Sequence, residues 1–218
     1  MYFESNGYAV ANGAAGIRKL CQALAGGVAI INIEISNARL REIPQIILQL
    51  TELESLTITE TSLEILPMEI GRLRGIRELS FGSNRLKHVA EEIGGLANLV
   101  NLNLASNQLA DLPHNIRTLS QLENLDISDN AFSIFPPQLC ELKSMQSLLI
   151  HSNQLQSIPA CIESLQKLGM LDIADNSIVD LPESLGKVSG LRHLIVTGNP
   201  LTNECIKWLQ SKSFFKAK

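Results

Sequence analysis

The hydrophobic positions of this chain follow neither a strand nor a helix for long. Between Leu122 and Leu142, the apolar side chains are separated by gaps of 3, 2, 5, 3, 4 and 3 residues. A strand alternates with a period of 2 and a helix repeats every ~3.6 residues, so this stretch mixes both periods within a short distance. The same mixture recurs along the chain at one fixed interval, which predicts a repeated structural unit.

The interval of recurrence is 23 residues. Leu125 belongs to one unit, and steps of 23 residues reach seven more apolar residues, which are Ile33, Leu56, Leu79, Leu102, Leu148, Leu171 and Leu194. We call these eight residues the first core positions. A second apolar residue follows two positions later in every unit. A fixed period between about 20 and 50 residues is the mark of a solenoid, in which each unit packs on its neighbours.

The two halves of the unit predict different backbone paths. The L-x-L half predicts a short strand, with two side chains facing inward and one facing outward between them. The L-P-x-x-I-x-x-L half places apolar residues three apart, which suits a 3₁₀ or short helical path back to the next strand. Proline occupies the same place in six units, at Pro44, Pro67, Pro113, Pro136, Pro159 and Pro182.

An asparagine lies five residues after the first core position in six units. Its amide both donates and accepts, so a stack of these residues is expected to bond the backbone groups that the turns leave free. Ala38 and Thr61 stand at this place in the first two units, and we therefore expect the N-terminal coils to be held less tightly. The predicted structural ladder comprises Asn84, Asn107, Asn130, Asn153, Asn176 and Asn199.

The unit L-x-x-L-x-L-x-x-N-x-L-x-x-L-P-x-x-I-x-x-L-x-x resembles the leucine-rich repeat. In its 23-residue form it is similar to intracellular proteins of the Ras-suppressor and Ras-scaffold group, and to bacterial and plant leucine-rich repeat proteins. The resemblance implies an α/β solenoid shaped like a horseshoe, with a parallel concave sheet, about eight coils and helical caps at both ends. It also implies a small GTPase or a phosphatase as a candidate partner.

The ends of the chain are expected to cover the exposed faces of the solenoid. We expect an N-terminal segment and capping helix over residues 1–27, repeats over 28–201, and a C-terminal cap and tail over 202–218. The first eight residues resemble the remnant of a cleaved tag and are left out of the fold prediction. One face of the N-terminal helix is formed by Ile17, Leu20, Cys21 and Leu24, with Gly26 and Gly27 ending it before a strand over 28–35. At the other end, Asn203 is expected to cap a helix that covers the last coil with Cys205, Trp208 and Leu209.

Composition narrows the class of protein. The chain has 18 basic and 22 acidic residues and a net charge of -4, which argues against nucleic acid and gives no reason to expect an anionic membrane. It has no apolar run of the ~18 residues that a membrane helix needs, and no recognisable secretory signal. Its 4 cysteines are widely spaced, so we expect reduced thiols and a cytoplasmic protein. A secreted effector without such a signal is the alternative.

Side chains that point away from the core define where a partner would bind. In each unit they lie one residue before and one, three and four residues after the first core position, and we call these four rows the concave rows. An apolar residue such as Leu149 among carboxylates is typical of a small binding hot spot for a basic peptide or protein surface. The alternative is that the acidic side chains have no binding role and only keep the sheet soluble. The candidate partner-binding residues are Asp126, Asp129, Leu149, His151, Met170, Asp172, Asp175, His193 and Ile195.

No feature of the sequence indicates catalysis. Phosphate-binding, nucleophile-elbow and zinc-protease motifs are absent, and we predict no catalytic residues, cofactor or metal. Asp126, His151 and Asp172 fall on successive expected strands, but strands ~4.8 Å apart place such groups at the outer limit for sharing one metal ion. An open, shallow sheet also does not enclose a small molecule.

The sequence therefore predicts a monomeric protein-interaction or scaffold module, active in signalling, that binds a protein partner on its concave face. The alternative is a bacterial effector, or the target-selecting fragment of a larger enzyme.

Overall fold

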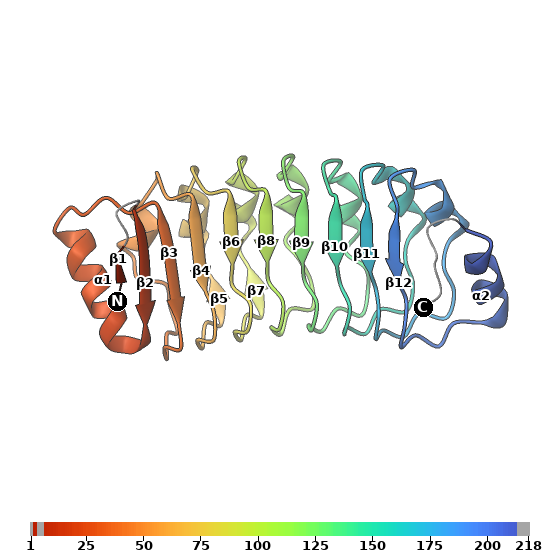
Figure 1. Cartoon of the computed structure of the whole chain (residues 1–218), viewed down its shortest axis with the longest axis horizontal. Helices are drawn as coiled ribbons and strands as arrows, with labels where there is room; N and C mark the ends of the chain where they lie inside the picture. The colour runs from red at the N-terminus through yellow and green to blue at the C-terminus, as the bar shows by residue number, and fades with distance from the viewer. Residues whose placement is uncertain (1, 4–6, 213–218) are drawn as a thin grey trace.

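A computed structural model describes residues 2–3 and 7–212, and there the chain is an elongated solenoid of short strands and 3₁₀ helices (Figure 1). Its strands stand side by side along the long axis, with helix α1 (Gly13–Ala25) at one end and helix α2 (Asn203–Gln210) at the other. The predicted leucine-rich repeat solenoid with a parallel sheet is confirmed.

One sheet runs the whole length of the molecule. Within the described residues nine strands are parallel, and β1 (Tyr2–Phe3) pairs antiparallel with β2 at the N-terminal edge. The parallel strands are β2 (Tyr8–Asn12), β3 (Asn32–Ser36), β4 (Ser55–Ile58), β6 (Glu78–Ser80), β8 (Asn101–Asn103), β9 (Asn124–Asp126), β10 (Ser147–Leu149), β11 (Met170–Asp172) and β12 (His193–Ile195).

The register of the sheet follows the sequence repeat. Leu148 of β10 pairs with Leu125 on one side and with Leu171 on the other, so each residue lies beside its counterpart in the next unit. Side chains alternate across the sheet, and Leu148 is buried while its neighbours Ser147 and Leu149 are half-buried on the other face. Rows of equivalent residues therefore cross the molecule on its concave face.

The return arms are mostly 3₁₀ helices, as the three-residue apolar spacing predicts. In five of these seven helices a proline immediately precedes the first residue, and its carbonyl accepts from the N–H of the buried Ile or Leu three residues on, as Pro113 does from Ile116 N–H (3.1 Å). The helices are η1 (Ile47–Gln49), η2 (Met68–Arg72), η3 (Glu91–Gly95), η4 (His114–Thr118), η5 (Pro137–Glu141), η6 (Ala160–Ser164) and η7 (Glu183–Lys187). Before η2 and η3, the short strands β5 (Ile65–Leu66) and β7 (His88–Val89) pair in parallel.

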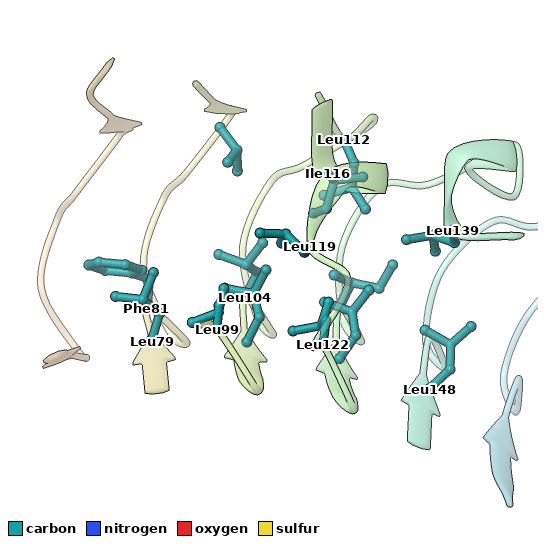
Figure 2. Packing of buried hydrophobic residues seen from close by; sticks show 14 of the residues in the cluster. Leu79, Phe81, Leu99, Leu104, Leu112, Ile116, Leu119, Leu122, Leu139 and Leu148 are labelled. Carbon is teal, nitrogen blue, oxygen red and sulfur yellow. The ribbon is translucent and has the colours of Figure 1, made fainter. Parts of the chain in front are cut away.

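A continuous aliphatic core lies between the sheet and the arms. Leu79 and Leu148 of the strands, and Leu104 just after β8, lie on the side of the arm residues Ile116 and Leu139, and all five are buried (Figure 2). Because every coil contributes the same kinds of side chain at the same places, each layer of the core packs on the next, which is how a solenoid acquires stability.

The N-terminal end differs from the sequence prediction. Helix α1 lies at this end, but a parallel strand, β2, precedes it, and Tyr8 pairs with Asn32 of β3. The parallel sheet thus has one strand more than the eight expected and begins inside the segment taken as a cap. The exclusion of residues 1–8 was wrong for Tyr2, Phe3 and Tyr8, and the strand expected over 28–35 begins only at Asn32.

Strand β2 was not predicted because its inward-facing side chains are small. Its inward residues are Ala9 and Ala11, which are fully buried but do not match the leucines of the repeat. Helix α1 replaces the usual arm and approaches closely, since a Cβ placed on Gly16 would lie 3.1 Å from the Ala11 carbonyl carbon. Alanine therefore occupies the strand where leucine would collide with the helix.

At the C-terminal end, helix α2 covers the last coil. Cys205 and Leu209 are buried, and Trp208 packs partly buried against the core. The helix N-cap is Thr202, whose hydroxyl accepts from Cys205 N–H (3.1 Å), and not Asn203 as predicted. Thr202 lies three residues before the bonded N–H, which is the geometry a cap requires.

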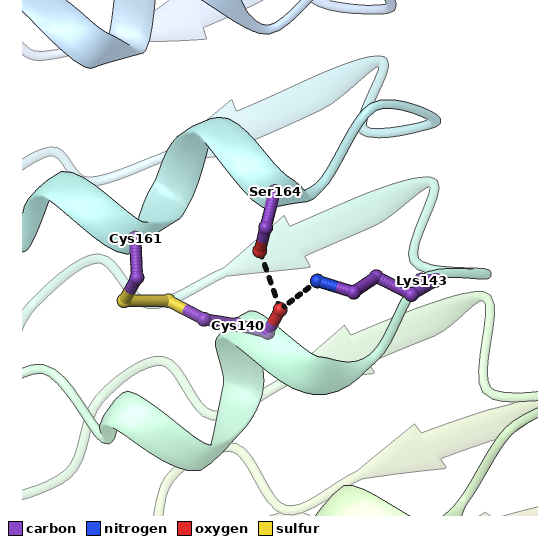
Figure 3. Close-up of a disulfide and its surroundings, with 4 residues drawn as sticks. All are labelled: Cys140, Lys143, Cys161 and Ser164. Carbon is purple, nitrogen blue, oxygen red and sulfur yellow. Dashed lines mark hydrogen bonds between the residues drawn. A yellow bond between two sulfur atoms is a disulfide. The ribbon is translucent and has the colours of Figure 1, made fainter.

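The prediction of four reduced thiols was wrong for two of them. Cys140 of η5 and Cys161 of η6 form a disulfide across neighbouring coils, with a Cα–Cα distance of 5.8 Å (Figure 3). The Cys140 carbonyl also accepts from Ser164 Oγ (2.5 Å) and Lys143 Nζ (2.8 Å). Linear spacing does not reveal this pair, because stacking brings residues of successive coils together. Cys21 and Cys205 are free, and burial raises the pKa of each thiol.

Candidate partner-binding surface

The sheet brings several of the candidate residues into one row on β9–β12. Asp126 pairs with Leu149, Leu149 with Asp172, and Asp172 with Ile195. The parallel row one position before the core holds Met170 and His193, which also pair. The structure therefore places a two-row patch of acidic, apolar and imidazole side chains on the C-terminal half of the concave face.

Most side chains of this patch, apolar and acidic alike, are half-buried on the open face of the sheet. Leu149 and Ile195 are half-buried on the open face of the sheet, as are Asp126, Asp172 and Met170. His193 is exposed, whereas His151 is half-buried and its Nδ1 lies 3.1 Å from Ser152 Oγ. A partner that contacts the first row would thus meet two alternating carboxylates and two apolar side chains.

Asp126 and Asp172 also have a structural role that the sequence analysis missed. Asp126 Oδ1 accepts from the backbone N–H (3.0 Å) and hydroxyl (2.6 Å) of Ser128, and Asp172 Oδ1 accepts from Ala174 N–H (3.0 Å). Asn103, in the same row, accepts from Ala105 N–H (2.9 Å). The recurrence of Asn or Asp at this place was the available signal, because such side chains bond their own backbone two residues on. The second carboxylate oxygen stays available to a partner.

Asp129 and Asp175 lie apart from the first row, in the turns that follow the strands. Both are exposed and adopt left-handed backbone conformations, with φ of 53° and 51°. Asn, Asp and Gly tolerate this conformation best, so the turn geometry accounts for part of the choice of Asp here. The same turn position is occupied by Asn37, Glu60, Ser83, Ser106, Ser152 and Gly198.

The charge of the concave rows has a single sign. Among the eight units these rows hold 7 carboxylates and no lysine or arginine. The acids are Glu34, Glu60, Glu78, Asp126, Asp129, Asp172 and Asp175. The concave surface therefore carries negative charge in both its N-terminal and its C-terminal half. The anionic area is larger than the part formed by the four C-terminal acids.

The middle of the concave face is lined by hydrogen-bonded amides. Asn124 Nδ2 donates to Asn101 Oδ1 (2.7 Å), and Asn101 Nδ2 donates to Glu78 Oε1 (3.2 Å). These residues border a shallow hollow of about 260 Å³ that reaches Asp126 and Leu149. The hollow connects the polar centre of the face to the candidate patch.

The asparagines at the predicted ladder positions connect each coil to the one before it. Asn153 Nδ2 donates to the carbonyls of Ile127, Ile150 and His151 (each 3.1 Å), and its Oδ1 accepts from Phe132 N–H (3.0 Å). Equivalent bonds are made by Asn107, Asn130, Asn176 and Asn199. At the start of the ladder, Asn84 Oδ1 accepts from Thr61 N–H (3.1 Å) and from the Thr61 hydroxyl.

The acid–histidine group does not assemble into a metal site. Leu149 stands between Asp126 and Asp172, so the two acids lie on alternate strands. Among residues 2–3 and 7–212, no group of three or more His, Cys, Asp or Glu side chains is arranged to hold a metal ion. In the described part of the chain, no helix has the length and apolar character to cross a membrane.

Comparison with family models identifies the class of protein. The model described as leucine-rich repeat region matches residues 83–211, and a second leucine rich repeat model matches residues 51–109. The chain belongs to the leucine-rich repeat family. Proteins of this family are typically non-catalytic modules for protein–protein interaction. The Ras-suppressor resemblance is not tested by these matches and stays a hypothesis.

Solved structures agree with this assignment. A leucine-rich repeat protein of Leptospira interrogans is 28% identical with a TM-score of 0.86, over 94% of this chain and 52% of that one. An internalin of Listeria monocytogenes is 21% identical with a TM-score of 0.70, over 80% of this chain and 50% of that one, and supports the fold alone. A plant peptide hormone receptor in complex with RGF2 is 25% identical with a TM-score of 0.64, over 91% of this chain and 35% of that one. No curated protein matched the sequence.

Proposed function

We propose that this chain is a non-catalytic recognition module whose concave face binds a basic segment of a partner protein. The observation that carries the proposal is the row Asp126, Leu149, Asp172 and Ile195, within concave rows that hold 7 carboxylates and no lysine or arginine. Lysine or arginine side chains of the partner would face the carboxylates, and an apolar side chain would contact Leu149 or Ile195.

Two further observations support a protein partner. The fold presents a preformed sheet, so little conformational entropy is lost when a segment lies across it. In addition, the similar plant peptide hormone receptor is in complex with RGF2. A small GTPase or a phosphatase remains a hypothesis from the Ras-related resemblance, and the solubility explanation of the acids is an outcome of the test below.

A second candidate function is target selection within a larger protein, in a bacterial effector or an enzyme. The chain spans about half the length of the Leptospira and Listeria proteins, at 52% and 50%. In such a protein the concave face would choose the target and another segment would act on it.

The disulfide is relevant to the cellular compartment in which the protein functions. Disulfides form and persist in oxidising compartments and are rare in the cytosol. The Cys140–Cys161 pair therefore favours the secreted alternative over the expected cytoplasmic location. Mass spectrometry of the native protein, alkylated before any reduction, tests this: labelling of all four cysteines would favour the cytoplasmic location.

The test of the concave site uses a fluorescent peptide of alternating lysine and leucine and a pull-down from lysate. The Asp126→Asn/Asp172→Asn variant keeps the oxygen that accepts from Ser128 or Ala174 and removes only the charge. Leu149→Ser removes the apolar contact. Both variants are expected to lose about tenfold or more in affinity for the peptide.

The matched control is Asp111→Asn/Asp180→Asn. Each of these acids also accepts a backbone N–H through Oδ1, from Leu112 and Leu181, but neither lies on a concave row. Equal weakening in test and control variants would reduce the effect to net charge and favour the solubility explanation. Unchanged binding in all variants would place the partner elsewhere on the solenoid.

A further inference from the structure

Positive charge gathers on a different surface, at the turns that leave the sheet in the first three units. Arg39 and Arg85 occupy the same place in units that are two apart, and Arg41 and Lys87 do so two residues further on. Arg39, Arg41 and Arg85 line a hollow of about 290 Å³ together with Ser62 and Glu64. We call this the basic hollow.

The arginines of the basic hollow are not neutralised by the protein. All three are exposed, and none of their guanidinium groups makes an ion pair or hydrogen bond with another residue of the described chain. The ion pairs present among the described residues are Arg117–Glu141 and Lys187–Glu163, elsewhere on the solenoid. Glu64, which lines the same hollow, also makes no ion pair within the described chain. The hollow is therefore lined by three guanidinium groups and one carboxylate.

An apolar hollow adjoins the basic one. It has a volume of about 380 Å³, shares Arg41 and Glu64 with the basic hollow, and is otherwise lined by Glu42, Ile43, Gln45, Ile65 and Pro67. Ile65 is 61% exposed, at a position where most other units have a polar residue and one has Ile134, which is 76% exposed. Unlike Ile134, Ile65 lies beside a cationic hollow. A cationic site and an apolar site therefore lie side by side.

We propose that these two hollows bind a phosphorylated segment of a partner protein, with its phosphate in the basic hollow and a neighbouring apolar side chain against Ile65. A phosphate group carries a charge near −2 and three acceptor oxygens, and it suits several arginines at once. A single carboxylate offers two oxygens and one charge, which leaves part of a three-arginine site unused. The Ser62 hydroxyl provides a further donor at the hollow.

A peptide fits this surface better than a polyanionic chain such as nucleic acid or a sulfated glycan. Polyanions need a basic stripe that neutralises many phosphates, whereas here three arginines share one hollow and Glu42 and Glu64 lie beside them. The apolar hollow would also have no counterpart on a sugar–phosphate backbone. The two hollows do not include any residue of the concave rows, so this proposal can be tested independently of the proposed function.

The test measures fluorescence anisotropy of a labelled peptide with phosphoserine followed by leucine in an alanine–glycine background, at low salt. Arg39→Gln and Arg85→Gln are each expected to weaken binding by about tenfold. Glu64→Gln removes the one anion of the basic hollow and is expected to tighten binding by about threefold. Arg74→Gln is the matched control, because Arg74 is exposed but lines neither hollow.

Comparison peptides decide between the occupants. The proposal predicts weaker binding when glutamate replaces phosphoserine and when glycine replaces leucine. It is overturned if the phosphopeptide does not bind, if Arg74→Gln weakens binding as much as Arg39→Gln, or if the glutamate peptide binds equally well. Heparin or duplex DNA that binds more tightly than the phosphopeptide, with the same dependence on Arg39 and Arg85, would assign the hollow to polyanions instead.

Discussion

At the scale of single residues, the buried polar side chains decide how coils are joined. Each ladder asparagine bonds both its own turn and the preceding coil, so one side chain fixes the spacing of two units. The sequence predicted which asparagines do this. The backbone N–H bonds that Asp126 and Asp172 accept were missed, although the recurrence of Asn or Asp at this place was a usable signal for them.

Replacing a ladder asparagine is expected to destabilise the fold. Asn153→Ala removes four hydrogen bonds and leaves the Phe132 N–H without a partner, while the Ile127 and Ile150 carbonyls keep only the bond from a neighbouring ladder asparagine. We expect a loss of about 2–4 kcal/mol in the free energy of unfolding, measured by urea denaturation. Asn98→Ala, which removes one exposed bond to the Arg74 carbonyl (2.9 Å), is the control, with an expected loss of about 1 kcal/mol or less. Equal losses in the two variants would contradict the special role of the ladder.

Glu91 provides a pH-dependent contact between two coils. Its carboxylate accepts from the backbone N–H groups of Asn115 (2.8 Å) and His114 (3.0 Å) at the start of η4, and these bonds hold its pKa below the usual value. Since the folded pKa is depressed, the stabilisation is present above the unfolded pKa and is lost as pH falls through the folded pKa. Glu91→Gln should therefore lower the denaturation midpoint at neutral pH. The difference from the unmutated protein should disappear in acid, and a difference that persists there would contradict the assignment.

At the scale of elements, the coils that follow the 23-residue pattern could be predicted from the sequence, and the coil that departs from it could not. Strands β3–β12 on the sheet and the 3₁₀ arms follow from leucine spacing, because each coil faces the same core. Strand β2 broke the pattern with Ala9 and Ala11, where close approach of α1 excludes larger residues. The disulfide was missed for another reason, since Cys140 and Cys161 do not occupy equivalent places in their units.

Removing this disulfide is expected to destabilise the protein. Cys140 and Cys161 are 21 residues apart, and closing a loop of that length restricts the unfolded chain by about 3 kcal/mol. The Cys140→Ser/Cys161→Ser variant should lose roughly that amount in urea denaturation. Reductant should weaken the unmutated protein and leave the variant unchanged. A protein whose stability does not respond to reductant, although the disulfide is present beforehand, would contradict the stabilising role.

At the scale of the whole molecule, the repeat decides where charges can gather. Equivalent residues line up in rows, so a preference repeated over a few units becomes a surface: acidic on the concave rows, basic at the turns of the first three units. The row from Asp126 to Ile195 could be read from the sequence by counting from the core. The basic hollow could not, because the volume enclosed by Arg39, Arg41 and Arg85 depends on how the turns stack.

Stability is also expected to vary along the solenoid. The coils of β3 and β4 have Ala38 and Thr61 at the ladder position, whereas the later coils are joined by asparagines from Asn84 to Asn199. In a chain of units that contact only their neighbours, weaker junctions open more often. Hydrogen exchange followed by mass spectrometry should therefore show faster exchange in β3 and β4 than in β8–β11.

An Ala38→Asn/Thr61→Asn variant would extend the ladder toward the N-terminus. It should slow exchange in β3 and β4 and leave exchange in β10 and β11 unchanged, because the effect of a junction reaches only nearby units. Uniform exchange along the unmutated sheet would mean that the solenoid opens as one cooperative body. The caps α1 and α2, rather than the ladder, would then limit its opening.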